Sequence, residues 1–249
     1  MRDDGGPHTL AIDIGGTGLK ASVLDKHGHM VGDHVRVPTP KRRTPPILLD
    51  ALEQLVAPLP PYDRVSIGFP GFVRDGRVIT APHLGTKDWK NFPLEKKLAE
   101  RLGKPARLAN DAEVQGLGIV SGHGLEVVLT LGTGLGSAVF VDGHMTPHLE
   151  LAHHPIHKSQ TYDEYVGDKA RRSLGKKKWS RRVLKMIGIV ETLLNYDILH
   201  LGGGNARDII GKLPRNVRIE SNDTGITGGI RLWDDAVWLS ARSGGHKPG

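Results

Sequence analysis

The chain has 249 residues, of which 38% are hydrophobic and 24% are charged, a composition typical of a soluble globular protein with one large domain or two smaller ones. No apolar run approaches the length of a membrane span and no signal-peptide pattern opens the chain, so we expect a cytoplasmic protein without a membrane partner. Cysteine is absent, which excludes disulfides and thiolate-bound zinc.

The first half of the chain is expected to alternate strands with helices. Apolar runs bounded by turn residues predict strands at residues 9–14, 19–24, 30–37, 65–68 and 106–108. Amphipathic spacing predicts helices at residues 47–57 and 94–102. Residues 15–18 join the first two strands, so the chain is predicted to begin with a hairpin that has a glycine-rich tip.

The second half repeats this order. Strands are expected at residues 127–131, 137–141 and 198–201, and helices at 179–194 and 227–239. The tetrapeptide Gly-Thr-Gly-Leu occurs at residues 16–19 and again at 132–135, each time at the tip of an expected hairpin. This recurrence indicates two duplicated halves, with a chance similarity between glycine turns as the alternative.

The two glycine-rich turns have the composition of phosphate sites. Glycines let backbone N–H groups approach phosphate oxygens, Thr17 adds a hydroxyl donor, and Lys20 adds a positive charge. Asp13, at the end of its strand, can orient Mg²⁺ through water. The predicted phosphate-binding residues are Asp13, Gly15, Gly16, Thr17, Gly18, Lys20, Gly132, Thr133 and Gly134. A tight turn without a ligand is the alternative, since neither turn matches a Walker loop or a dinucleotide fingerprint.

Five segments, taken in order, make a family resemblance specific. They are Asp13-Ile-Gly-Gly-Thr-Gly18, Gly68-Phe-Pro-Gly71, Asn110-Asp-Ala-Glu113, Leu131-Gly-Thr-Gly-Leu-Gly136 and Gly202-Gly-Gly204. Together they resemble the motifs of ROK-family sugar kinases. Within that family, the stretches at 13–18, 37–40 and 140–143 are similar to those of bacterial polyphosphate glucokinases.

The resemblance implies an α/β chain with the actin-like, ribonuclease-H-like ATPase fold, in which two similar halves surround a central cleft. The expected division is a small α/β domain at residues 1–109 and a large α/β domain at residues 110–228. A C-terminal helix at about residues 229–249 is expected to pack back on the small domain. The resemblance also implies a homodimer.

The implied activity is that of a glucokinase, which transfers a phosphoryl group from polyphosphate, ATP or both to the 6-hydroxyl of glucose with Mg²⁺ and without zinc. Asp111 would be the general base that accepts the proton of the attacking hydroxyl. The sugar-binding residues that the resemblance implies are Gly71, Asn110, Asp111, Glu150 and His153, and the nucleotide-side residues are Gly202, Gly203 and Gly204. Without the resemblance, a helix cap is the favoured interpretation of Asn110 or Asp111.

Three departures from the family pattern affect the expected sugar site. Ala152 stands where the family has glycine, and it would be strained if the position required a positive φ. His153 lacks the cysteine-rich zinc loop that fixes this histidine in many relatives. His83 stands where relatives often have asparagine, which leaves the preferred hexose open.

The choice of donor depends on a basic segment. Residues 169–185 contain nine Lys and Arg and no acidic residue. The positive charge of this segment therefore exceeds the net charge of the whole chain, which is +7. Such a patch attracts polyanions, and a solvated helix face is the alternative. We expect a polyphosphate track at Lys176, Lys177, Lys178, Arg181 and Arg182. Trp179 is the only aromatic residue among them, so specific nucleic-acid binding is not expected.

Two other functions remain open. One is a kinase that uses ATP alone and acts on another hexose or an N-acetylhexosamine, with the adenosine side near Gly202–Gly204 and residues 222–225. The other is a non-catalytic sugar-binding regulator. The first expected strand begins at about residue 9, which leaves no room for an N-terminal DNA-binding segment. The presence of Asp13, Thr17, Asp111 and Thr133 also argues against a dead site.

Overall fold

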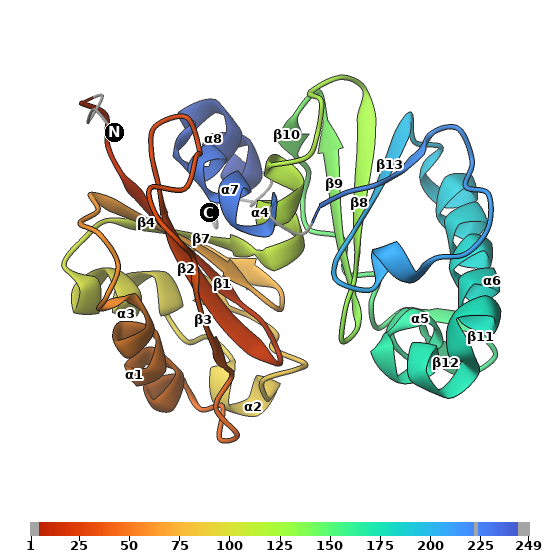
Figure 1. Ribbon diagram of the computed structural model, residues 1–249, viewed down its shortest axis with the longest axis horizontal. Coiled ribbons are helices and arrows are strands. Elements are labelled where there is room, and N and C mark those ends of the chain that lie inside the picture. The colour runs from red at the N-terminus through yellow and green to blue at the C-terminus, as the bar shows by residue number, and fades with distance from the viewer. Residues whose placement is uncertain (1–4, 222–223, 244–249) are drawn as a thin grey trace, which may run out of the picture. The chain divides into compact units, whose positions relative to one another are not determined.

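The computed structural model describes residues 5–221 and 224–243, which divide into two compact units. The first unit takes its residues from Met1–Gly118 and Asp223–Gly249, and the second from Ile119–Asn222. Each unit has its own five-stranded sheet and its own hydrophobic core (Figure 1). The chain therefore enters the second unit once and returns to complete the first.

The sheet of the first unit has the strand order β3-β2-β1-β4-β7. The bounds of these strands are β1 Thr9–Ile14, β2 Gly18–Leu24, β3 Val35–Pro38, β4 Arg64–Phe69 and β7 Ala106–Asn110. β2 is antiparallel to both β1 and β3, whereas β1, β4 and β7 are parallel to one another. The carboxyl ends of three strands therefore lie at one edge of this sheet.

Helices cover both faces of the first sheet. One face packs against α1 Pro45–Val56 and α3 Leu94–Leu102, whose leucines join the main core of the unit. The other face carries α4 Asp111–Leu117, α7 Thr224–Thr227, η2 Gly228–Trp233 and α8 Asp235–Ser243. The remaining elements are β5 Val73–Arg74, β6 Arg77–Val78 and α2 Thr86–Trp89.

The C-terminal segment differs from the single helix predicted at residues 227–239. Gly228 and Gly229 pack closely on the first unit, because a Cβ atom at Gly228 would collide with the carbonyl oxygen of Val114. Ser66 Oγ also donates a hydrogen bond to Gly229 O at 2.7 Å. These contacts hold a 3₁₀ turn between α7 and α8. Residues 244–249 of the helix predicted at about 229–249 lie outside the described residues.

α4 belongs to the first unit, although the sequence-based division at residues 109/110 assigned it to the second domain. Its first residue, Asp111, lies against β4, where a Cβ atom at Gly68 would come within 3.4 Å of the Asp111 Cα. Because α4 packs on this sheet, the structural division follows the helix, at Gly118, and not the end of β7.

The second unit repeats the sheet of the first. Its strand order is β10-β9-β8-β13-β14, with β8 Leu125–Leu131, β9 Leu135–Val141, β10 His144–Met145, β13 Ile198–Gly202 and β14 Val217–Ile219. β9 is antiparallel to β8 and β10, and β8, β13 and β14 are parallel. The same order and directions in both sheets support the duplication that the repeated tetrapeptide indicates.

A long helix forms much of the core of the second unit. α6 Asp168–Leu194 follows α5 Tyr162–Val166, and the smaller elements are β11 Pro155–His157, β12 Gln160–Thr161 and η1 Ala206–Asp208. Gly175 interrupts α6 with φ 72° and ψ 158°, a conformation that suits glycine. After this break, Trp179 is buried and its Nε1 donates to Val166 O at 2.7 Å. Among the described helices, none combines the length and apolar character that a membrane span requires.

Candidate active site

Three predicted site segments of the first unit meet at one sheet edge. The turn at residues 15–18 follows β1, Pro70 and Gly71 follow β4, and Asp111 follows β7. These three strands are parallel neighbours, so their carboxyl ends lie side by side. In open α/β sheets this edge is where ligands bind. The structure therefore brings together the first glycine turn, the Gly71 turn and the predicted base.

Thr39 holds the first glycine turn in place. Gly15 N donates to Gly18 O at 2.9 Å and closes the turn. Thr39 N donates to Thr17 O at 3.2 Å, and Thr39 Oγ1 donates to Gly15 O at 2.7 Å. These bonds tie the carbonyl groups of the turn to the end of β3. The sequence predicts no role for Thr39, although its place between Pro38 and Pro40 at a strand end is a signal for one.

Asp13 and Lys20 form an ion pair beside this turn. Lys20 Nζ lies 3.4 Å from Asp13 Oδ2, and the Asp13 side chain is 23% exposed. Desolvation raises the pKa of the Asp13 carboxyl, and the charges of Lys20 and Arg36 oppose that rise without cancelling it. Asp13 is thus a partly covered carboxylate whose charge already has a counterion.

Asn110 is the cap of α4. Its Oδ1 accepts a hydrogen bond from Ala112 N at 2.9 Å, and its backbone N–H donates to Glu113 Oε2, which completes a capping box. Its Nδ2 donates to Gly71 O at 3.1 Å and lies 3.4 Å from Phe69 O. The amide predicted to bind sugar therefore fixes the Gly71 turn, and its direct contact with a sugar stays a prediction.

Asp111 and Gly71 each depend on a close backbone approach. Asp111 Oδ1 accepts from Ala112 N at 2.8 Å, and its Cα sits where Gly68 leaves room. Gly71 packs so tightly on the chain that a Cβ atom there would collide with Thr80 O. Position 71 therefore requires glycine for steric reasons, which the sequence motif alone does not reveal, whereas a Cβ atom at Gly68 would make an ordinary van der Waals contact with Asp111.

His83, which stands where ROK relatives often have asparagine, lies next to the first glycine turn. A Cβ atom at Gly16 would come within 3.2 Å of the His83 Cβ. Arg43 Nη1 donates to His83 O at 2.6 Å, and Trp89 Nε1 donates to Arg43 O at 2.7 Å. This chain of contacts holds the segment around His83 against the first glycine turn.

The second glycine turn occupies the equivalent place in the second unit. Gly132 N donates to Gly134 O at 3.0 Å, which closes this turn over one residue fewer than the bond between Gly15 N and Gly18 O in the first. Asp168 N, at the start of α6, donates to Gly132 O at 3.1 Å. Gly203, with φ 83°, packs against the backbone of Leu131 so closely that no side chain fits. The predicted phosphate turn at 132–134 and the glycines at 202–204 are therefore neighbours at one edge of the second sheet.

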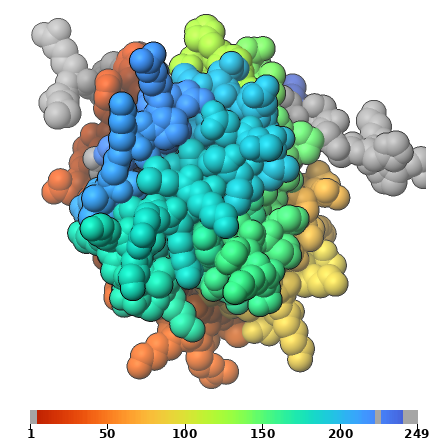
Figure 2. All heavy atoms as spheres, turned by 90° about the vertical axis from the view of Figure 1, so that its right-hand side faces the viewer, coloured from red at the N-terminus to blue at the C-terminus, as the bar shows by residue number. Residues whose placement is uncertain are grey.

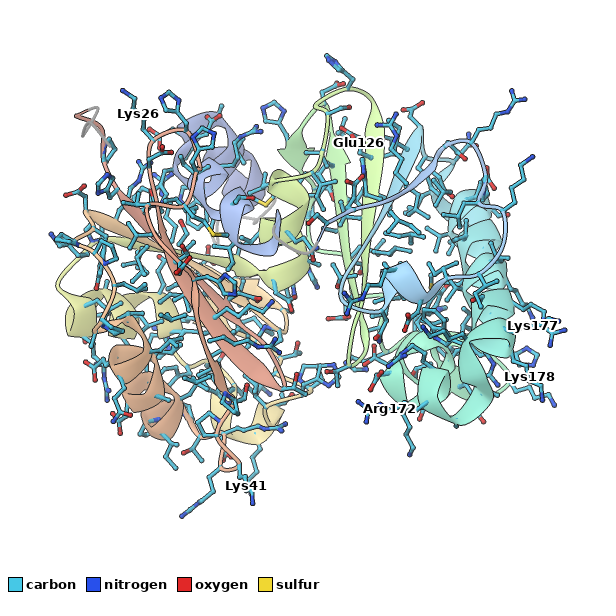
Figure 3. All side chains as sticks on the ribbon, in the orientation of Figure 1. Lys26, Lys41, Glu126, Arg172, Lys177 and Lys178 are labelled. Atoms are coloured by element: carbon cyan, nitrogen blue, oxygen red, sulfur yellow. The ribbon has the colours of Figure 1, made fainter. Side chains whose placement is uncertain are left out.

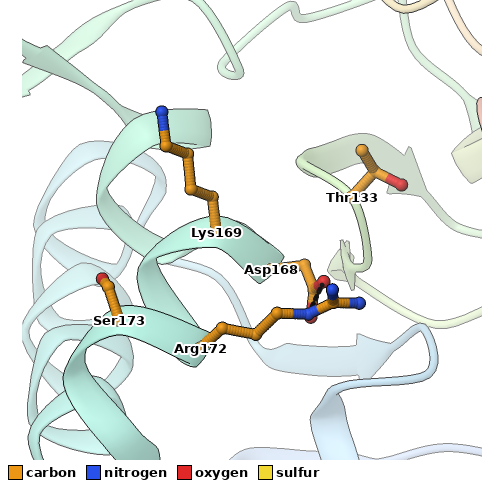
Figure 4. Close-up of a pocket in the computed structure, with 5 residues that line it drawn as sticks. All are labelled: Thr133, Asp168, Lys169, Arg172 and Ser173. Carbon is orange, nitrogen blue, oxygen red and sulfur yellow. Dashed lines mark ion pairs between the residues drawn. The ribbon is translucent and has the colours of Figure 1, made fainter.

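A pocket opens beside the second turn (Figure 4). Its lining residues are Thr133, Asp168, Lys169, Arg172 and Ser173. Arg172 Nε pairs with Asp168 Oδ2 at 2.7 Å, whereas the Lys169 side chain extends away from that pair in Figure 4. The pocket thus joins a hydroxyl of the glycine turn to two cationic side chains of α6. Lys169 and Arg172 belong to the basic segment at residues 169–185, but they are not among the site residues predicted from the sequence.

Glu150 and His153 lie in the second unit, on the segment after β10. Desolvation acts to raise the pKa of Glu150, but the hydrogen bond and charge of His148 and the N–H of Ala152 outweigh it and lower the pKa. Ala152 does not have a positive φ, so the alanine is unstrained. His153 is exposed, and no group of three metal-ligating side chains occurs within the described ranges. The Glu150 carboxylate is thus fixed by His148 and the N–H of Ala152. The sugar-binding role of Glu150 and His153 stays a prediction.

Some cations of the basic segment have a partner in the second unit, and others have none among the described residues. Lys176 Nζ pairs with Asp208 Oδ1 at 2.6 Å, and the Arg182 guanidinium stacks on the Tyr165 ring at 4.5 Å. Of the five cations predicted for the track, Lys177, Lys178 and Arg181 are exposed and have no ion pair with a described residue. Lys177 and Lys178 point away from α6 in Figure 3, and Figure 2 turns the face that carries this helix toward the viewer.

These observations narrow the predicted polyphosphate track. Lys176 and Arg182 already have partners within the second unit, whereas the other three of the five predicted cations have no ion-pair partner among the described residues. Trp179 is buried and cannot stack on a ligand. On the nucleotide side, Asn222 and Asp223 of the predicted segment lie outside the described residues.

Comparisons with known proteins agree with this geometry. A model of the ROK family matches residues 9–153. The polyphosphate glucokinase of Mycobacterium tuberculosis is 28% identical over 209 residues, which are 80% of this chain and 78% of that protein.

Two solved structures are similar along almost the whole chain. The inorganic polyphosphate/ATP-glucomannokinase from Arthrobacter sp. strain KM has a TM-score of 0.83 at 30% identity and covers 94% of this chain and 99% of its own. A ROK family glucokinase from Streptomyces griseus, solved with glucose and AMPPNP, has a TM-score of 0.77 at 20% identity, with coverages of 92% and 99%. These likenesses confirm the predicted actin-like, ribonuclease-H-like fold. With the motifs, the repeated sheets and the family match in agreement, the chain belongs to the ROK family and has the fold of its sugar kinases.

Proposed function

We propose that this chain is a glucokinase that transfers a phosphoryl group from polyphosphate, ATP or both to the 6-hydroxyl of glucose. Its membership of the ROK family and its similarity to a polyphosphate glucokinase and a glucomannokinase support this function. The observation that carries the proposal is geometric. Asp111 begins α4 at the same sheet edge as the Gly15–Gly18 glycine turn.

Asp111 acts as the general base in this proposal. A carboxylate near the attacking hydroxyl accepts its proton as the new O–P bond forms, which is worth roughly 10²–10⁴ in rate. Asp111 is held by α4, and Asn110 fixes both the start of that helix and the Gly71 turn. The base and the turn expected to bind sugar therefore share one support.

Each glycine turn, taken within its own unit, would bind donor phosphates. Backbone N–H groups of the turns, Thr17 and Lys20 would bind the phosphate oxygens. Mg²⁺ would neutralise charge on the donor when bound. Asp13 suits such an ion as a water-mediated ligand only, because it is a single carboxylate already paired with Lys20 and the ion's other ligands must come from water and the donor.

Polyphosphate has a further set of partners available in the second unit. The pocket beside Thr133 carries Lys169 and Arg172, and the exposed Lys177, Lys178 and Arg181 continue along α6. A long polyanion that binds several such cations releases counterions, so its affinity falls steeply with salt. ATP has fewer phosphates and would respond to salt less.

A donor and acceptor screen tests the proposal. Purified protein is incubated with Mg²⁺ and glucose, and with polyphosphate, ATP or no donor, and glucose 6-phosphate is measured. We expect product with polyphosphate, and none without a donor. Product with ATP but none with polyphosphate would exclude polyphosphate as the donor. Phosphorylation of N-acetylmannosamine but not of glucose would contradict the proposed sugar. Light scattering on the same sample tests the homodimer that the family resemblance implies.

A further inference from the structure

Residues of the candidate site form a row across the first sheet. The register pairs Arg36 on β3 with Lys20 on β2, and it pairs Lys20 with Asp13 on β1. Asp13 in turn lies beside Gly68 on β4, and the Asp111 Cα sits over Gly68. Directly paired residues project from the same face of a sheet. The row therefore extends from the proposed base at one end to Arg36 at the other.

The guanidinium group of Arg36 lies against the end of the first glycine turn. A Cβ atom at Gly18 would lie 3.3 Å from Arg36 Nε and 3.4 Å from its Nη2. The Arg36 side chain is exposed, and it forms no ion pair with any residue that the structure describes. Its charge acts on Asp13 through space, against the desolvation that raises the pKa of that carboxyl.

The part of the row on β1, β2 and β3 has one carboxylate, Asp13, and two cations, Lys20 and Arg36. Asp13 and Lys20 offset each other at 3.4 Å, so the charge of Arg36 leaves this end of the sheet positive. Phosphoryl transfer spreads negative charge over the phosphate oxygens, and fixed cations beside them stabilise the transition state. Arginine suits this task because its planar fork can bind two phosphate oxygens at once.

We propose that Arg36 binds the phosphoryl donor as a second cation beside Lys20 at the Gly15–Gly18 turn. The ligand class is an anhydride-linked phosphate, as in polyphosphate or ATP. This inference rests on the proposed function, because that function supplies the phosphoryl donor. Arg36 binds the donor and has no contact with the sugar.

Three variants test this role. Arg36→Gln removes the charge, Arg36→Lys keeps the charge without the fork, and Lys41→Gln removes another exposed cation of the first unit. The side chain of Lys41 points away from the ribbon in Figure 3, so it is a matched control for net charge. Binding of tripolyphosphate is measured by calorimetry, kcat and KM are measured for donor and glucose, and thermal unfolding verifies that each variant is folded.

We expect Arg36→Gln to weaken tripolyphosphate binding and to lower kcat/KM for the donor by about 10-fold or more, with the KM for glucose unchanged. Arg36→Lys should recover part of the loss, and Lys41→Gln should stay within about twofold of the unsubstituted protein. Equal tripolyphosphate affinity in Arg36→Gln and the unsubstituted protein would overturn the inference, as would an equal loss in Lys41→Gln. If the protein binds tripolyphosphate through Arg36 but phosphorylates no sugar, the proposed function fails while the role of Arg36 stands.

Discussion

Asn110 and Asp111 are adjacent in the sequence but have different tasks. The Asn110 amide has bonds to Ala112 N and Gly71 O, so its polar atoms are committed to the scaffold. Asp111 Oδ1 accepts a hydrogen bond from Ala112 N, which a neutral amide oxygen can also accept. A substitution at Asp111 should therefore lower turnover, whereas a substitution at Asn110 should lower stability.

Asp111→Asn is expected to remove the base and keep the fold. Asparagine retains an oxygen for Ala112 N but cannot accept the hydroxyl proton, so kcat should fall by at least about 10²-fold. The melting temperature should change little. Steady-state kinetics with glucose and calorimetric scans measure the two effects, and turnover at the unsubstituted rate would remove Asp111 from the proposed mechanism.

The main expected effect of Asn110→Ala is a lower free energy of unfolding. The substitution removes an N-cap and leaves the buried Gly71 carbonyl without its donor, which should cost about 2–3 kcal/mol of unfolding free energy. Urea unfolding of the unsubstituted and variant proteins measures this cost. An unfolding midpoint equal to that of the unsubstituted protein would show that the cap and the turn do not depend on this amide.

At the scale of elements, the sequence predicted best what depends on local pattern. The helix at Leu94–Leu102 and the strand at Thr9–Ile14 have the predicted bounds, because their apolar spacing and flanking turns lie within the segment. The two glycine hairpins are also as predicted. By contrast, the commitment of Asn110 to the Gly71 turn joins residues 39 positions apart, which no local pattern encodes.

The start of α6 shows another limit of local pattern. The predicted helix began at Trp179, yet the structure extends α6 back to Asp168 across the break at Gly175. Residues 168–178 contain Gly175 and many cations, so they do not show the amphipathic spacing that predicts a helix. Similarly, the sequence could count cations in residues 169–185 but could not say that Asp208, from a distant segment, pairs with Lys176.

The salt dependence of polyphosphate binding can distinguish the unpaired cations of α6 from Lys176, which pairs with Asp208. The triple change Lys177→Gln, Lys178→Gln and Arg181→Gln should weaken polyphosphate binding about 10-fold at low salt and flatten its salt response, because fewer counterions are released. ATP binding should change far less. Lys176→Gln is the matched control, since Lys176 is held by Asp208. A salt response as steep in the triple variant as in the unsubstituted protein would contradict the track.

At the scale of the whole molecule, the chain crosses between its two units twice, and both crossings connect to one histidine. His200 Nε2 lies 3.0 Å from Glu126 Oε2, and His200 Nδ1 lies 2.7 Å from Glu220 Oε1. Glu126 accepts N–H bonds from Ser121 and Gly122, just after the chain enters the second unit. Glu220 lies just before it leaves. A buried imidazole with a carboxylate at each nitrogen thus links both segments inside the second unit.

This arrangement predicts an acid-sensitive stability. Desolvation acts to raise the pKa of Glu126, but the N–H bonds of Ser121 and Gly122 and the bond with His200 outweigh it and lower the pKa below its ordinary value. A carboxyl whose pKa is lower in the folded state stabilises fully above its unfolded pKa of about 4.5, and this contribution is lost as the pH falls through the lower, folded value.

Glu126→Gln should therefore lower the free energy of unfolding by about 1–3 kcal/mol at pH 7, because the buried histidine loses a charged partner and two N–H groups lose a charged acceptor. The difference from the unsubstituted protein should shrink as the pH falls below about 4.5. Glu220→Gln is the matched control: it bonds the same imidazole but is 24% exposed, against 0% for Glu126, so its effect should be smaller. Urea unfolding at several pH values measures both, and a Glu126→Gln difference that stays constant into acid would show that this carboxylate does not link stability to pH.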